Sequence, residues 1–270
     1  NNVNAGYIST ATSHSNRKNT ALGYGALTNN AGFSNHAFGY EALTANTTGV
    51  NNHAFGYSAL SKNTTGNTNH AFGHEALSAN VSGGANSAFG YIALRNNTAS
   101  GNSAFGYSSL DVNNTGANNS AFGSNSMGAN TMGSNNTAMG NSALGTNQTG
   151  ANNTAVGSYA LYTNKAEGNT AMGYESLRSN NTGTKNTAVG RHALRANTSA
   201  TSNTAVGDSA LVRATTASHN TAVGQKALSA TTNANYNTAV GSNVLEKNTA
   251  SNSSAFGYNA LNGNTNGAYN

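Results

Sequence analysis

Only 7% of this 270-residue chain is charged, and its net charge of +5 comes from 12 basic and 7 acidic side chains scattered along the sequence. That scatter argues against a nucleic-acid-binding protein, which gathers basic residues on one face, and the low charge argues against a disordered chain. The sequence has no Cys and no apolar stretch of about 18 residues, which excludes disulfides, thiolate metal sites and a membrane-spanning helix.

A single phrase, close to Asn-Thr-Ala-Val-Gly-Tyr-x-Ala-Leu-x-x-Asn-Thr-Thr-Gly, organises the chain. Its first glycine, the marker glycine, recurs every 16 or 17 residues and defines position 0 of each repeat. A fixed period of this length indicates a solenoid in which each repeat forms one turn, here called a rung. The marker glycines are Gly23, Gly39, Gly56, Gly73, Gly90, Gly106, Gly123, Gly140, Gly157, Gly173, Gly190, Gly207, Gly224, Gly241 and Gly257.

Residues 1–18 follow the period poorly, although Gly6 lies 17 residues before Gly23. We expect an irregular entry or a degenerate first rung there. From residue 19 to residue 270 the repeat runs without a linker, which predicts one continuous repeat domain of about sixteen rungs in all.

Each repeat contains two short apolar pieces, such as residues 187–189 and 193–194, bracketed by Gly and by Asn/Thr-rich turns. Frequent Gly and Asn disfavour helix, and the pieces are of strand length. The sequence therefore predicts an all-β fold, a parallel β-solenoid with two or three short strands per rung.

Positions −2, −1 and +4 carry the apolar ladders. Position −2 is always Ala, and it faces either a cramped interior corner or a neighbouring chain, because strands buried on both faces read this way. Position −1 is Leu, Phe, Met or Val, and position +4 is Leu except at Met127. We expect positions −1 and +4 to form the core, with the ladder Leu43, Leu60, Leu77, Leu94, Leu194, Phe55, Phe72, Phe89, Val189 and Val206.

Asn recurs at positions −4 and +7. Stacked Asn side chains can hydrogen-bond from one rung to the next, so we expect these amides to be buried and mutually satisfied.

Position +1 tolerates polar and charged residues, so we expect it to face solvent. Tyr40, Tyr57, Tyr91 and Tyr107 lie there and are candidates for contact with a glycan or a protein receptor. The alternative is that each amphipathic ring lies over its own coil.

His36, His53 and His70 occupy position −3 in three consecutive repeats, where most others have Thr or Ser. Stacked imidazoles are weak candidates for a metal site, especially if three chains met there. The alternative is polar substitution for Thr, since no carboxylate or Cys accompanies them. The few acidic residues have no partnered base, so we expect neither an enzyme nor a cofactor.

The repeated phrase Asn-Thr-Ala-Val-Gly, a small-residue–Leu step and Asn-Thr-Thr-Gly resembles the head repeats of trimeric autotransporter adhesins and repeats of bacterial and phage fibre proteins. The resemblance covers about Asn19 to Asn270. It implies a left-handed β-roll, intertwined as a homotrimer, that binds a host matrix or cell surface. The 17-residue repeat is longer than is common in those heads.

We therefore expect a non-enzymatic fibre or adhesin shaft at an extracellular, cell or virion surface, with a host protein or glycan as partner and no nucleic acid. The trimer interface would use the Ala or the Phe/Val ladder. One alternative is an ice-binding solenoid, but the Thr ladder from Thr137 to Thr238 is replaced by His or Ser in the earlier repeats after Thr20. A self-assembling extracellular filament is the other.

Overall fold

The computed structural model describes residues 18–265 and 267–269. The chain divides into two compact units, Asn1–Asn135 and Asn136–Asn270, which we describe separately. Residues 1–17, and with them almost all of the expected irregular entry, lie outside the described residues. Within the described part, no helix is long and apolar enough to cross a membrane.

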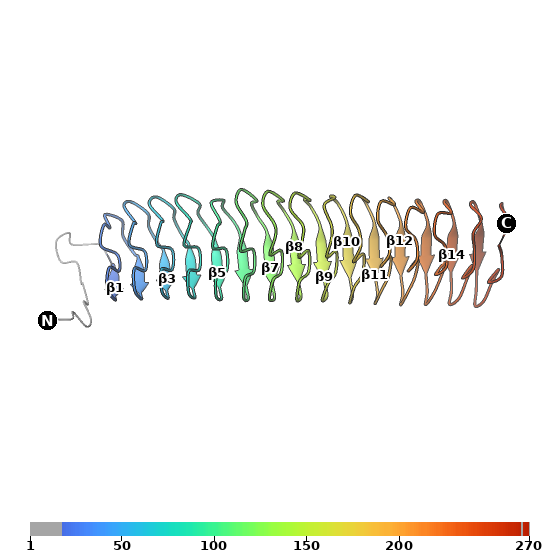
Figure 1. The fold of residues 1–270 in the computed structure, drawn as a ribbon, viewed down its shortest axis with the longest axis horizontal. Coiled ribbons are helices and arrows are strands. Elements are labelled where there is room, and N and C mark those ends of the chain that lie inside the picture. The colour runs from blue at the N-terminus through green and yellow to red at the C-terminus, as the bar shows by residue number, and fades with distance from the viewer. Residues whose placement is uncertain (1–17, 266, 270) are drawn as a thin grey trace. The chain divides into compact units, whose positions relative to one another are not determined.

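Each unit is a stack of rungs joined by parallel, in-register strands (Figure 1). Every described strand has three residues, occupies positions −3 to −1 and pairs with its neighbours in chain order, as Ala188 pairs with Ala205. The first unit contains β1 (Thr20–Leu22), β2 (His36–Phe38), β3 (His53–Phe55), β4 (His70–Phe72), β5 (Ser87–Phe89), β6 (Ser103–Phe105) and β7 (Ser120–Phe122). The second contains β8 (Thr137–Met139), β9 (Thr154–Val156), β10 (Thr170–Met172), β11 (Thr187–Val189), β12 (Thr204–Val206), β13 (Thr221–Val223), β14 (Thr238–Val240) and β15 (Ser254–Phe256). The predicted all-β, parallel β-solenoid is confirmed.

Alternate strand residues point to opposite faces, and the face that points inward carries Ala. Position −2 is fully buried in almost every described rung, as at Ala188, whereas Val206 at position −1 is 36% exposed. This corrects the expectation that Phe55, Phe72, Phe89, Val189 and Val206 line the core, because only the methyl group of Ala lies on the inner side of the strand. The same burial places the Ala ladder in the interior and not against a neighbouring chain.

The interior is narrow and is lined by Ala at position −2, mainly Ala at position +3 and, except at Met127, Leu at position +4. Leu43, Leu60, Leu77, Leu94 and Leu194 are all fully buried. Residues at position +4 adopt a left-handed conformation with φ between 47° and 54°. That conformation costs roughly 1 kcal/mol for an L-residue, whereas burying a Leu side chain contributes about 1.5–3 kcal/mol. The free energy gained by burying the Leu side chain therefore exceeds the cost of the left-handed backbone.

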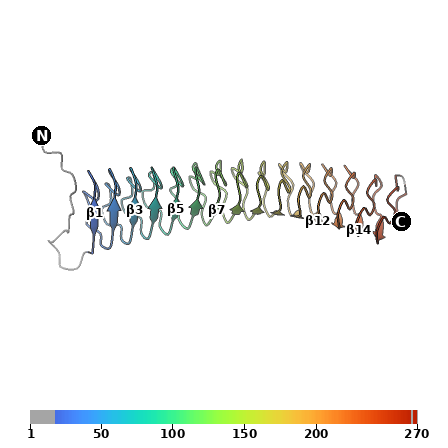
Figure 2. The ribbon, with the colours of Figure 1, turned by 90° about the horizontal axis from the view of Figure 1, so that it is seen from below.

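The left-handed residues also explain why each described rung has one strand and not the two or three that the sequence suggests. The Ala-Leu piece lies in a tight turn, so its backbone cannot pair in an extended ladder. Figure 2 shows the single strand at the same place on successive rungs of each unit.

The marker glycine makes the corner that follows the strand. Its φ lies between 107° and 144° in every repeat, a region that residues with a side chain rarely adopt. Successive corners also approach closely, because a Cβ atom added at Gly190 would lie 2.5 Å from the carbonyl oxygen of Gly207. Both constraints demand glycine.

Two ladders of buried Asn line the remaining, polar side of the interior. Asn63 at position +7 donates from Nδ2 to Oδ1 of Asn46 one rung earlier, at 2.8 Å, and to the carbonyl of Gly66, at 3.0 Å. Asn52 at position −4 donates to the same carbonyl at 2.7 Å, and its Oδ1 accepts the backbone N–H of Asn69. The predicted rung-to-rung amide bonds are present in most described rungs, and they satisfy groups whose burial would otherwise cost free energy. The Oδ1 of Asn197 has no hydrogen-bond partner among the described residues, because the next rung carries Ala214 at position +7.

Because each described strand packs on the strands before and after it within its unit, removing one whole rung should leave a folded stack. We expect deletion of residues 190–206, one 17-residue repeat, to join Val189 to Gly207 in register and to retain cooperative unfolding at a somewhat lower temperature. Circular dichroism during heating measures this. A control deletion of residues 190–198, which breaks the register, should abolish the transition of the second unit. Loss of folding in both variants would contradict the additive stacking.

Candidate binding surface

The outward side of the strands, formed by positions −3 and −1, is the strand face. Its apolar ladder at position −1 is half-buried or exposed throughout, with exposed fractions up to 46% at Met139 and 68% at Phe256. In the first unit the ladder is aromatic from Phe38 to Phe122, with parallel rings whose centroids lie 4.6–4.9 Å apart. In the second unit it is mainly Val and Met. An apolar stripe of this length on a surface is typical of an interaction site.

Position −3 adds a polar ladder beside the apolar one. In the second unit it is Thr in seven consecutive rungs, from Thr137 to Thr238, and in the first unit it includes the three stacked histidines. His36, His53 and His70 pack edge to face, with centroids 4.9 and 4.8 Å apart. Their rings do not converge on one point, and no group of three or more His, Cys, Asp or Glu among residues 18–265 and 267–269 could hold a metal ion.

Partial burial, followed by the neighbouring rings of His70 and His36, lowers the pKa of His53 from its ordinary value. A lowered pKa means that the unfolded chain binds the proton more tightly than the folded one. The contribution of His53 to stability is therefore complete above about pH 6.5, the pKa of a histidine in the unfolded chain, and is lost as the pH falls below it.

We expect acidification from pH 8 to pH 5 to lower the melting temperature of the wild type more than that of His53→Thr. Threonine occupies the same position in the second unit, so the replacement fits the strand. The difference between the two proteins isolates the imidazole. If acidification lowered the melting temperature of both proteins equally, the stacked rings would not shift the pKa of His53.

Position +1, across the marker glycine from the apolar ladder, carries the tyrosine ladder of the first unit: Tyr24, Tyr40, Tyr57, His74, Tyr91 and Tyr107. Its rings stack with centroids 5.0–5.5 Å apart and planes within 20° of parallel. The tyrosines are between 42% and 70% exposed, so the structure places the four predicted contact residues in solvent and in one continuous row.

Several charged side chains near these ladders are paired with each other. Arg95 contacts Asp111 at 3.0 Å and Glu75 at 3.8 Å, and burial raises the pKa of Asp111 although Arg95 opposes the shift. In the second unit, Glu175 contacts Arg195, Arg178 and His192. Most of these pairs join neighbouring rungs, whereas Glu175 and Arg178 belong to the same rung.

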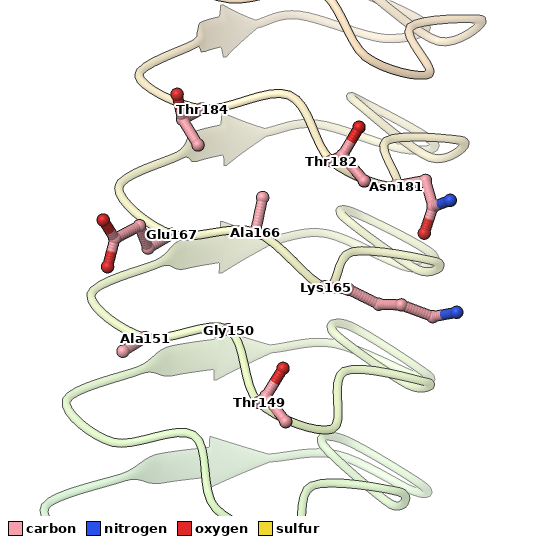
Figure 3. A pocket seen from close by; sticks show the side chains of 9 residues that line it. All are labelled: Thr149, Gly150, Ala151, Lys165, Ala166, Glu167, Asn181, Thr182 and Thr184. Carbon is pink, nitrogen blue, oxygen red and sulfur yellow. The ribbon is translucent and has the colours of Figure 1, made fainter.

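A recess of about 320 Å³ opens where the repeat between Gly157 and Gly173 is one residue shorter than its neighbours. In Figure 3, the side chains of Lys165 and Glu167 point in opposite directions from its two ends. The remaining lining is small, and the two charges do not form a paired site. The recess is lined by Thr149, Gly150, Ala151, Lys165, Ala166, Glu167, Asn181, Thr182 and Thr184.

No protein-family model matches the sequence, and neither a curated protein nor a solved structure matches the chain.

Proposed function

We propose that this chain is the non-enzymatic shaft of an extracellular fibre or adhesin, in which the strand faces of three copies pack together. The observation that carries the proposal is the apolar ladder at position −1, which runs through every described rung of both units and is left half-buried or exposed. A stripe of this kind needs a partner to remove it from water.

The period of the ladder favours another copy of the chain as its partner. Its side chains recur once per rung over 15 strands, and a surface with the same period and chemistry is available on a second copy of the chain. Closed symmetry gives each copy the same environment. The number three, a left-handed coil and a place on a cell or virion surface follow from the resemblance to adhesin heads and fibre repeats.

The attachment role is tested with beads that carry the purified chain. We expect such beads to adhere to surfaces coated with extracellular matrix or with whole cells, and beads that carry an unrelated protein of equal charge to wash off. Failure to adhere to every coated surface would contradict the adhesin role.

A second candidate, ice binding, is favoured by one observation. The seven outward threonines of the second unit lie in an unbroken row beside Val and Met, which gives that part of the strand face a regular array of hydroxyl and methyl groups. Inhibition of ice recrystallisation that is lost in Thr187→Lys, together with no bead attachment, would favour this function over the first.

A further inference from the structure

We infer that the tyrosine ladder is a binding surface for a neutral, linear, β-1,4-linked polysaccharide of the cellulose or chitin type. The inference extends the proposed function by naming the class of partner, and it uses a surface separate from the apolar ladder. Six aromatic side chains from consecutive rungs form this surface, with no interruption between Tyr24 and Tyr107.

The tyrosine rings are accessible along the whole row, since the five tyrosines are between 42% and 70% exposed. Parallel rings in direct face-to-face contact would lie about 3.5–4.0 Å apart. The observed centroid distances of 5.0–5.5 Å with nearly parallel planes exceed this distance, so successive rings are not in full face-to-face contact. The ladder therefore offers a row of partly exposed aromatic rings, and each of its five tyrosines adds a phenol hydroxyl that both donates and accepts hydrogen bonds.

The electrostatics favour a neutral ligand. The ladder contains no Lys or Arg, and the carboxylates of Glu41 and Glu75 follow directly after Tyr40 and His74. A hydrogen bond to Glu41 and the charge of that carboxylate raise the pKa of Tyr40, so this phenol stays protonated. Its proton is directed at Glu41, and its oxygen can still accept a hydrogen bond. A polyanion such as a nucleic acid would meet negative charge here without the basic residues that bind phosphate.

The spacing selects the kind of polymer. A ligand that contacts every ring must repeat once per rung, and each sugar of an extended β-1,4-linked chain advances by close to the distance between the rings. Such a sugar presents C–H groups on its faces and hydroxyls at its rim, which match ring faces and phenol groups. An extended peptide advances about 3.3 Å per residue and falls out of step with the ladder.

A second copy of the chain does not explain the tyrosines. The apolar ladder at position −1 continues through both units, whereas position +1 changes to Ser124, Asn141 and Ser158 after Tyr107. An interface between copies would need the apolar ladder throughout both units. It gives no reason for an unbroken row of aromatic rings at position +1 in the first unit, where the second unit has only the separated Tyr174 and Tyr258.

The test uses the full chain and measures its depletion from solution by microcrystalline cellulose and by chitin. We expect binding to at least one polymer and none to starch, whose α-linked chain coils. The combined variant Tyr40→Ser, Tyr57→Ser and Tyr91→Ser should bind the polymer with an affinity at least roughly tenfold lower, because three ring contacts are lost. Ser occupies position +1 in other rungs, and the control Tyr174→Ser removes an isolated tyrosine between Ser158 and Arg191 and should change nothing.

The molar mass of each protein separates this inference from the assembly of copies. A wild type that is a single chain but binds cellulose or chitin supports the glycan surface and contradicts the trimer. A trimeric wild type that binds neither polymer, or a triple variant that binds as well as Tyr174→Ser, overturns the glycan surface.

Discussion

Gly190→Ala is expected to unfold the second unit or to destabilise it by about 4 kcal/mol. The backbone at this corner has φ of 128°, which alanine rarely adopts. The new Cβ would also lie 2.5 Å from the carbonyl oxygen of Gly207 and 2.6 Å from its carbon, so neighbouring rungs would have to separate. The free energy of unfolding in urea, followed by circular dichroism, measures the loss.

Gly168→Ala is the matched control. This glycine also has a positive φ, 68°, but no atom lies within 4 Å of its added Cβ. The substitution should therefore cost only the backbone strain, about 1 kcal/mol. Equal losses at the two positions would mean that the close approach of successive corners does not explain why the marker glycine recurs.

Ala188→Arg is the second substitution with a large expected effect. Ala188 is fully buried on the inner side of β11 among Ala and Leu side chains. The buried Glu175 of the preceding rung is already paired with Arg178 and Arg195. An unpaired buried charge costs about 3–5 kcal/mol or more. We expect the rungs around β11 to unfold, with a loss of the circular dichroism signal of the second unit.

Val189→Arg, the next residue along, points outward and provides the control. Its side chain would reach solvent from the strand face, so the unfolding free energy of a single chain should change by no more than about 1 kcal/mol. The contrast between neighbouring positions tests which side of the strand faces the interior. Unfolding by Val189→Arg and tolerance of Ala188→Arg would reverse the assignment.

Much of this fold could be predicted from the sequence because the period is explicit. A residue type that recurs at one position must meet its own copies in a stacked fold, so the fully buried Leu ladder and the Asn amide bonds follow from the spacing alone. The solvent-facing position +1 could also be predicted, because Arg191 and Gln225 share it with tyrosine.

The sequence pattern could not show which side of the strand faces the interior, because positions −2 and −1 are both apolar. One signal in the sequence does separate them. Position −2 is always Ala, as a tightly packed interior requires, whereas position −1 ranges from Val to Phe, a change of volume that a close-packed interior would not accommodate. The left-handed backbone at position +4 could not be predicted in this way, since Leu has no preference for that conformation.

The central claim, that the strand face is buried between copies, is tested most directly by the molar mass in solution. Sedimentation equilibrium should give three times the 27.2 kDa of one chain for the wild type, and 27.2 kDa for a variant that combines Val189→Arg with Val206→Arg and remains folded. A wild type that sediments as a single folded chain at all concentrations would contradict the claim.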